Sequence, residues 1–535
     1  MKVEAGNVVA FVLYFLLVIG IGVYFFMQDR KTSGEKSFFL GGRKMGGMVA
    51  ALSAGASDMS AWVLMGLPGS IYLYGIGQVW ISVGLLIGTI LAWFLVAPRL
   101  RRYSILANDS ITIPQYLTNR FLSSSKALQV ICAIIFMIVY CVYGASSISA
   151  CGTLFKTLFN LDERIGMTIA TVIIVAYVFL GGFNAVCWTD FLQGLLMLAA
   201  LMITPIVAVA LLKVNGAVAA GTIPDNFYNP LVSGKFDWES VSTILTGLGW
   251  GLGYFGMPHI IVRYISIKSE KEMKKSRIVG IGWTTLILIM ASVVGIVGRQ
   301  YLGDSVTGAS STVFIMMAAT VFPIFIGGVI ISAILAASMS TADSQLLAAS
   351  SAFASDVYKT TIRKNAKDKE VLWAGRIIVV VISLVAFGIA MLGYGETPIV
   401  PAFATIMSLV SAAWAAFGAA FGPVIILSLF WRRLNYKGAV ASIVCGFIVD
   451  ILWMILFNYE YYGDTSVIYN TGLYEIIPGF IVGICVAIGV SLLTEAPSEA
   501  VTKLFDLATN TKSVEVENEQ VLIDNAPIAK ESIDA

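Results

Sequence analysis

Long apolar runs recur along almost the whole chain, and they limit its fold more than any other feature. Each run holds about twenty residues or more, the length a helix needs to cross a bilayer and roughly twice what a membrane strand needs. Only helices and closed barrels satisfy their backbone hydrogen bonds within lipid. The sequence therefore predicts an all-α polytopic membrane protein with about thirteen transmembrane helices. The runs span residues 7–27, 46–66, 73–97, 126–156, 161–180, 187–213, 239–265, 275–300, 324–352, 371–393, 399–430, 437–457 and 473–494.

The composition excludes several functional classes. Hydrophobic residues make up 58% of the chain and charged residues only 12%, about half the charged share of a soluble protein. The single histidine, His259, excludes a multi-histidine metal site. No Walker-type phosphate loop occurs, so an ion gradient or a partner has to drive any pumping. The six cysteines are interpreted as packing residues. The net charge of +2 does not point to nucleic acid, and no obligatory protein partner is implied.

The loops between the runs alternate between basic ones and ones without Lys or Arg. The loop at residues 263–277 begins with Arg263 and continues with several lysines, whereas the loops at 67–72, 394–398 and 458–472 contain neither residue type. Cytoplasmic loops of membrane proteins carry the excess of Lys and Arg. The pattern predicts a multi-pass protein of the cell membrane with its N-terminus outside and its C-terminus in the cytoplasm. We interpret the first run as a retained helix and not as a signal peptide.

The second run contains a carboxylate, Asp58, near its middle. A carboxylate at the centre of a spanning helix costs about 2.5–3.5 kcal/mol on insertion scales, and such residues are functional by default. Small residues surround it in the sequence Ser-Ala-Gly-Ala-Ser-Asp-Met-Ser-Ala (residues 53–61). A helix that unwinds there would turn free carbonyls toward a cation. The alternative is that Asp58 pairs with a neighbouring helix and only holds the bundle together.

The run at 239–265 is the second candidate for an interrupted helix. Its centre reads Gly-Leu-Gly-Trp-Gly-Leu-Gly-Tyr-Phe-Gly-Met-Pro (residues 247–258), and glycines with a proline favour a break. Trp250, Tyr254 and Pro258 are spaced four residues apart and share a face, which favours a small-molecule pocket. The alternative is close helix packing through the small residues.

The positions of the two candidate breaks predict an inverted repeat. They lie in the second and seventh runs, so five spans separate them and the second one starts in the opposite orientation, as in inverted-repeat transporters. The expected division is a first helix with a basic loop (1–45), repeat 1 (46–213), an extracellular loop (214–238), repeat 2 (239–430), two peripheral helices (431–494) and an acidic cytoplasmic tail (495–535). The tail is predicted to be mostly disordered, with residues 501–507 able to lie on the membrane.

A hydroxyl cluster in the run at 324–352 completes the candidate site. Ser340 and Thr341 are adjacent, Ala337 is one turn before them, and Asp343 follows in the same turn. Oxygen ligands suit hard cations, although most intramembrane hydroxyls only bond to their own helix. Asp190, near the start of the run at 187–213, is a further candidate, with a helix N-terminal cap as the alternative.

These stretches together resemble the sodium:solute symporter family, and most closely its sodium/proline symporters. The resemblance covers residues 1–495. Its motifs are residues 57–69 (Ser-Asp-Met-Ser-Ala-Trp-Val-Leu-Met-Gly-Leu-Pro-Gly), 139–141 (Val-Tyr-Cys), 181–190 (Gly-Gly-Phe-Asn-Ala-Val-Cys-Trp-Thr-Asp), 250–259 (Trp-Gly-Leu-Gly-Tyr-Phe-Gly-Met-Pro-His) and 338–341 (Ser-Met-Ser-Thr).

The resemblance implies a leucine-transporter-like fold of five plus five inverted helices, with a broken first helix in each repeat. It implies coupling roles for Asp58 and Asp190. It implies a sodium site formed by the carbonyls of Ala56, Met59 and Ala337 and the hydroxyls of Ser340 and Thr341. It implies a solute pocket lined by Ser60, Ala61, Tyr140, Trp250, Tyr254 and Pro258. Two positions near this pocket depart from the proline branch, because Ala61 replaces an expected glycine and Met257 an expected glutamine.

The function implied by the resemblance is sodium-coupled symport of L-proline into the cell by alternating access. Another small carboxylate, such as pantothenate, or a different amino acid is the alternative solute. A channel would not couple sodium to a saturable solute. An enzyme would need an acid/base or nucleophile constellation, and Asp58, Asp190 and Asp343 lie on different predicted helices with no histidine base in a motif. We therefore expect no enzymatic activity.

Overall fold

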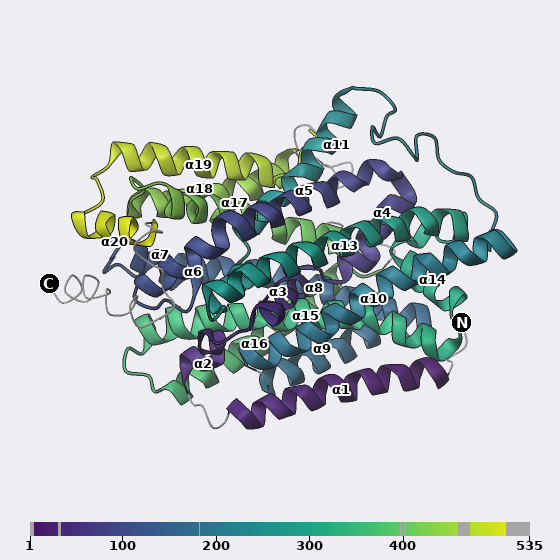
Figure 1. Ribbon diagram of the computed structural model, residues 1–535, viewed down its shortest axis with the longest axis horizontal. Coiled ribbons are helices and arrows are strands. Elements are labelled where there is room, and N and C mark those ends of the chain that lie inside the picture. Colours follow the sequence, from purple (N-terminus) through teal and green to yellow (C-terminus); the bar gives the residue numbers. More distant parts are fainter. Residues whose placement is uncertain are drawn as a thin grey trace.

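The computed structural model describes residues 5–29, 34–180, 182–395, 398–400, 403–457 and 471–509. Within these ranges the chain is a helical bundle without named strands, and only Met45 and Ile267 form an isolated bridge. Ten of the described helices are long and apolar enough to cross a membrane, or eleven when one bent pair is counted as a span. The predicted polytopic helical membrane protein is therefore confirmed. Figure 1 shows the long helices side by side, with α1 at one edge of the bundle and α18 and α19 at the other.

The first part of the chain contains α1 (Ala5–Asp29), α2 (Glu35–Leu40), η1 (Gly41–Arg43), α3 (Gly47–Asp58), η2 (Trp62–Gly66), α4 (Leu67–Tyr74), η3 (Ile76–Gln78), α5 (Val79–Leu91), η4 (Ala92–Val96), α6 (Ala97–Leu106), α7 (Ile113–Arg120), α8 (Ala127–Phe159), α9 (Glu163–Leu180) and α10 (Phe183–Asn215). The second part contains α11 (Trp238–Gly249), η5 (Trp250–Phe255), α12 (Pro258–Ser266), α13 (Glu270–Leu302), η6 (Thr307–Thr312), α14 (Val313–Val321), α15 (Ile324–Ser351), η7 (Ala352–Ile362), α16 (Asp368–Leu392), α17 (Ile406–Phe430), α18 (Tyr436–Phe457), α19 (Ile476–Leu493) and α20 (Glu499–Thr509).

The helix that contains Asp58 is interrupted directly after this residue. Met59, with φ −82° and ψ 70°, leaves the helical conformation, and the chain resumes as the π-helix η2 and then α4. The axis turns by 61° across this break. The predicted run 46–66 is too short, because the helical segment continues past Pro68 to Tyr74. Proline is tolerated there because it stands in the first turn of α4.

The glycine-rich helix changes its winding more gradually. α11 passes into the 3-10 helix η5, Met257 is extended with φ −73° and ψ 107°, and α12 begins at Pro258. The glycines also permit close packing, since a Cβ on Gly84 of α5 would lie 2.1 Å from the carbonyl oxygen of Gly247. The run at 239–265 therefore contains both an interrupted helix and close helix packing through its glycines.

α3 lies at the centre of the bundle, in contact with α10, α12, α13 and α15 (Figure 1). η5 packs against α5 and α17. α15 is almost entirely buried along its second half, including Ser340 and Asp343. The two interrupted helices and α15 therefore share the interior of the bundle.

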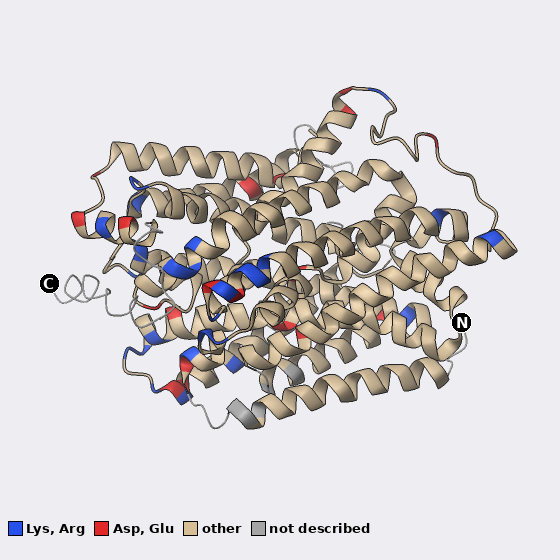
Figure 2. Cartoon of the chain, viewed as in Figure 1, with Lys and Arg blue, Asp and Glu red and all other residues tan. Residues whose placement is uncertain are grey.

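Lys and Arg gather at the end of the bundle where α20 lies (Figure 2). Not all of these cations face solvent, however. Arg263, which the sequence places at the start of a basic loop, is only 1% exposed, and it lies inside α12. The assignment of Arg263 to the loop is therefore wrong, because its side chain pairs with a buried carboxylate instead of projecting into water.

The start of the acidic tail is ordered and docks on the bundle. α20 contacts α6 and α7, and its Phe505 ring lies 5.2 Å from the Arg120 guanidinium. Asp506 forms an ion pair with Arg432 at 2.8 Å. The segment predicted to lie on the membrane thus packs its apolar face on protein. The rest of the tail, residues 510–535, lies outside the described residues.

Candidate cation and solute site

α3 and α15 bring three oxygen atoms together beside the first break. The Ser340 hydroxyl donates to the carbonyl of Ala56 at 2.9 Å and lies 3.2 Å from the carbonyl of Ala337. Thr341 follows on α15, and its buried hydroxyl has no hydrogen-bond partner among the described residues. Met59, the first residue after α3, is fully buried. Oxygens about 3 Å apart match the spacing around a hard cation with ligands at roughly 2.3–2.6 Å, so these residues fit a small cation.

Asp58 links the two interrupted helices. Its side chain is 1% exposed, and Oδ2 accepts a hydrogen bond from the Tyr254 hydroxyl of η5. Oδ1 has no partner in the described part of the chain. The alternative that Asp58 pairs with a neighbouring helix is thus correct for one oxygen. The other oxygen remains available to a further donor or cation.

Five aromatic rings pack together at the second break. Trp250 stacks on Tyr474 at 5.2 Å and on Trp414 at 6.3 Å, and its ring lies 5.8 Å from Trp62. The indole N–H of Trp414 donates to the carbonyl of Trp250 at 2.8 Å, and the Trp414 ring meets Tyr254 edge-on at 5.3 Å. Trp414 therefore fixes both the backbone and the rings of η5.

Sequence reasoning missed Trp414. The signal was a lone tryptophan among alanines at residues 412–416, because so large a side chain in a small-residue stretch needs a specific space.

Tyr140 and Pro258 lie on the α12 side of the second break. The Tyr140 hydroxyl accepts from the backbone N–H of His259 at 3.2 Å and lies 3.2 Å from its Nδ1. Pro258 lines a small cavity together with Phe136, Phe183 and Ser344 among others. Ser60 and Ala61 lie within the first break, each 1% exposed. The expected pocket residues thus divide between the aromatic stack, the first break and the start of α12.

Asp190 belongs to a buried network that joins four helices. Its Oδ2 accepts from the Ser53 hydroxyl of α3 at 2.6 Å, from Arg263 of α12 at 3.2 Å and from the Ser344 hydroxyl of α15 at 3.3 Å. It is not a helix cap, because α10 begins at Phe183 and its N-cap is Gly182. Removing one partner of a buried ion pair typically costs about 3–5 kcal/mol.

Arg263 also donates to Ser344 and to the carbonyl of His259. Asp343 accepts from the Ser344 hydroxyl at 3.2 Å, and its Oδ2 has no partner among the described residues. No group of three or more Cys, His, Asp or Glu with metal-ligand spacing occurs in the described ranges. The interior can therefore hold a cation through hydroxyls, carbonyls and single carboxylates.

Comparisons with known proteins agree with this arrangement. The model of the sodium:solute symporter family matches residues 38–446. The chain is 41% identical to the high-affinity proline transporter PutP of Bacillus subtilis (strain 168), over 93% of this chain and 100% of the relative. It is 40% identical to the osmoregulated proline transporter OpuE of the same organism (92% and 96% covered). It is 38% identical to the sodium/proline symporter of Escherichia coli (strain K12) (94% and 96% covered).

Solved structures share the fold at low sequence identity. A Na+-coupled sialic acid symporter in a substrate-bound outward-open state has a TM-score of 0.73 at 19% identity, over 93% of this chain and 100% of that one. MhsT in complex with L-phenylalanine has a TM-score of 0.52 at 14% identity, over 83% and 98%. The family match covers most of the chain and includes both interrupted helices. The chain belongs to the sodium:solute symporter family.

Proposed function

We propose that this protein carries L-proline into the cell together with sodium by alternating access. The observation that carries the proposal is the group of oxygens from Ala56, Ala337 and Ser340 beside the free hydroxyl of Thr341. The names of relatives at about 40% identity support proline as the solute. Ala61 and Met257, the two departures near the pocket, keep another amino acid or a small carboxylate such as pantothenate as the second candidate.

The proposed architecture has thirteen spans with inverted repeats at 46–213 and 239–430, flanked by 1–45, 214–238, 431–494 and 495–535. Its support is that interrupted helices open both proposed repeats. The basic end of the bundle (Figure 2) supports a cytoplasmic C-terminus and an outside N-terminus.

The chain's own residues would form the sodium site at the contact of α3 and α15. Ala56, Met59 and Ala337 would offer carbonyls, and Ser340 and Thr341 would offer hydroxyls. Bound sodium would supply a positive charge that binds both helices. Each sodium moving inward gains about 2.3 kcal/mol per 100 mV, roughly a 50-fold accumulation of solute.

Asp58 would transmit this contact to the solute pocket. Its bond to Tyr254 ties the end of α3 to η5, so a movement of α3 also moves the aromatic wall formed by Trp250 and Tyr254. Trp250 and Tyr254 would pack against the apolar ring of the solute, with Ser60 and Ala61 at the first break and Tyr140 and Pro258 at the α12 side. Asp190, paired with Arg263, would hold α10 and α12 in register with α3.

The test is uptake of labelled L-proline by purified protein in liposomes with an imposed sodium gradient. We expect saturable uptake that requires sodium and increases when the interior is made negative. Unlabelled pantothenate and other amino acids are added as competitors. If proline neither enters nor competes while another solute does, proline is the wrong solute. If no solute enters with sodium, the symport proposal itself fails.

A further inference from the structure

A lateral cavity lies between the peripheral helix α1 and the core helices α10 and α15. Its volume is about 350 Å³. Leu13, Leu17 and Leu192 at its rim are 52%, 54% and 39% exposed, so the cavity opens on the surface that lipid covers. It is separate from the cation and solute site. Its lining includes Ala10, Leu13, Tyr14, Leu17, Val18, Ile21, Thr189, Leu192, Gln193, Leu196, Val329 and Ser332.

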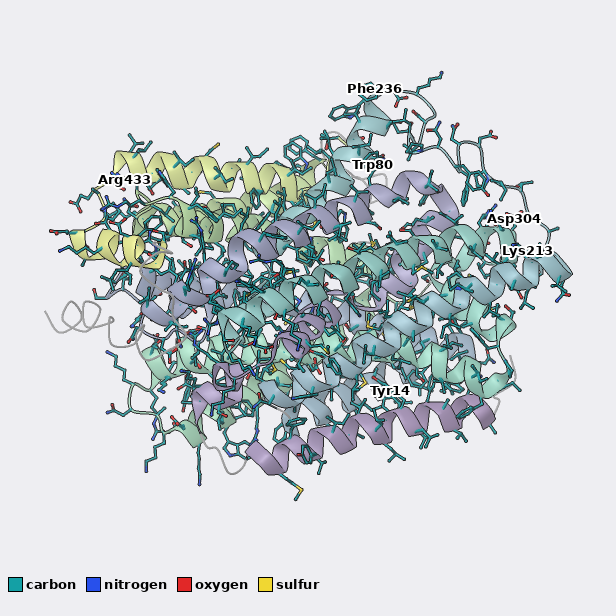
Figure 3. All side chains as sticks on the ribbon, in the orientation of Figure 1. Tyr14, Trp80, Lys213, Phe236, Asp304 and Arg433 are labelled. Carbon is teal, nitrogen blue, oxygen red and sulfur yellow. The ribbon has the colours of Figure 1, made fainter. Side chains whose placement is uncertain are left out.

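The floor of this cavity is polar. Gln193, only 2% exposed, donates through Nε2 to the hydroxyl of Tyr14 at 2.8 Å. Tyr14 extends from α1 toward the bundle (Figure 3), and its hydroxyl donates to Met339 Sδ at 3.8 Å. The remaining amide atom of Gln193, Oε1, is buried just below the cavity surface and has no hydrogen-bond partner among the described residues, so a ligand pairs with it when the amide turns toward the cavity. An unpaired amide oxygen is costly within a bilayer, where little water is present to satisfy it.

The depth of the floor determines what can reach it. Tyr14 lies nine residues after the start of α1, roughly 14 Å along a helix of 25 residues at 1.5 Å per residue. This position is close to the middle of the hydrocarbon layer, which is about 30 Å thick. A phosphate headgroup is confined to the membrane surface, so an ordinary phospholipid cannot place a polar group here. The occupant has to dissolve in the hydrocarbon and carry its polar group with it.

We propose that this cavity binds a membrane-dissolved alcohol, an apolar molecule with a single hydroxyl that pairs with Gln193. A hydroxyl both donates and accepts, so it complements the free atom of the amide in either orientation of the Gln193 side chain. The cavity, about 350 Å³ and open to the surface that lipid covers, has room for a hydrocarbon chain of several carbons. The leucines of the cavity wall cover this chain.

Occupancy of the cavity is coupled to the cation site by two short connections. Gln193 lies three residues after Asp190 on α10, and Met339 directly precedes Ser340 on α15. An alcohol that fixes Gln193 and Tyr14 therefore restrains both helices near the coupling groups. The binding itself does not depend on which solute the protein carries.

The experiment uses a ten-carbon alcohol with a photoreactive diazirine on its chain, added to the purified protein in liposomes. After illumination, mass spectrometry locates the labelled peptides. We expect labelling on the cavity-facing segments of α1 and α10. Excess 1-decanol should prevent this labelling, whereas excess decane should not. Gln193→Leu should weaken competition by 1-decanol about tenfold, the effect of one hydrogen bond.

Leu17→Trp narrows the mouth of the cavity without touching its floor, and it should also abolish the labelling. Val12→Trp is the matched control, because Val12 is an exposed residue of α1 that does not line the cavity. Equal competition by decane, or unchanged competition in Gln193→Leu, would mean that no hydroxyl is recognised and that water satisfies the amide. Labelling elsewhere, or labelling unaffected by Leu17→Trp, would overturn the site itself.

Discussion

The two interrupted helices achieve their breaks in different ways. The first stops within a single residue, at Met59, and turns by 61°. The second keeps a 3-10 winding over six residues before Pro258 starts a new helix. The first break presents oxygens to its neighbours, the Ala56 carbonyl to α15 and the Asp58 carboxylate to η5, whereas the second break offers aromatic rings. The comparison indicates that the first break serves the ion and the second serves the solute.

The two interrupted helices also differ in the contacts that stabilise them. α3 begins at Gly47, whose backbone N–H donates to the Glu272 carboxylate of α13 at 2.5 Å, and polar contacts from Ser340 and Tyr254 hold its other end. α11 has a side-chain cap from Asp237, and the glycines behind it allow close contact with α5. The first helix is therefore stabilised by bonds that an ion or a solute can exchange. The second is stabilised by packing that neither needs to disturb.

The largest effect is expected from removing the charge at the first break. Asp58→Asn keeps a group able to bond to Tyr254 but loses the negative charge, so the initial rate of sodium-driven solute uptake should fall roughly 100-fold, as for loss of a hydrogen bond to a charged group. Tyr254→Phe keeps the carboxylate and should lower this rate only about tenfold. Uptake in proteoliposomes measures both. Equal losses of uptake in the two variants would mean that the charge of Asp58 contributes nothing beyond its hydrogen bond to Tyr254, and the first break would then have no separate role in binding the ion.

The next effect concerns the packing of the second break. Gly84→Ala places a methyl group 2.1 Å from the carbonyl oxygen of Gly247 and should destabilise the protein by about 1–3 kcal/mol. Gly282→Ala on α13 is the control, because a Cβ there meets nothing within 4 Å. Thermal unfolding in detergent compares the two. Similar Tm values for both variants would mean that the close approach of α5 does not stabilise the end of α11 at the second break.

A smaller and more selective effect is expected from Trp414→Phe. The ring stays, but the hydrogen bond to the carbonyl of Trp250 is lost, so KM for the solute should rise about fivefold to tenfold. The sodium dependence should remain unchanged, because the lost hydrogen bond ends on Trp250 in the second break. Trp453→Phe in α18, which removes a hydrogen bond to the carbonyl of Leu473, is the matched control. A change in sodium dependence alone would contradict the division of roles.

The smallest effect is expected at the cap of α11. The backbone N–H of Ser240 donates to Asp237 and holds the pKa of its carboxyl below the ordinary value. A lowered folded-state pKa contributes stability above about pH 4, the unfolded value, and loses it as the pH falls through the folded value. Asp237→Ala should lower Tm at pH 7 by on the order of 1 °C. The Tm difference between the wild type and Asp237→Ala should shrink as the pH falls. A Tm difference that grows on acidification would contradict a lowered pKa of Asp237 in the folded state.

Local residue type allowed the breaks to be predicted from the sequence. Asp58 among small residues and glycines before Pro258 signal broken helices because these residues form helix poorly or cannot continue it. Residue type does not fix the ends of the spans, since Pro68 looks like a terminator but stands in the first turn of α4.

Long-range partners were not predictable. Arg263 adjoins a lysine-rich segment in the sequence, and nothing local reveals that Asp190, more than seventy residues earlier, neutralises it. The role of Trp414 likewise depends on the position of Trp250, which only the packed bundle fixes. The packing of α20 on the bundle likewise depends on the contact of Phe505 with Arg120, which lie far apart in the sequence. Such pairings depend on tertiary packing, which neither periodicity nor composition encodes.

The most direct test of the account is equilibrium binding of radioactive sodium to the purified protein in the absence of solute. Ser340→Ala and Thr341→Ala should each raise the sodium concentration for half-saturation about tenfold or more, while Thr189→Ala, on α10 and outside the proposed ligand set, should leave it near the wild-type value. Unchanged sodium affinity in both α15 variants would contradict a cation bound between the break of α3 and the hydroxyls of α15.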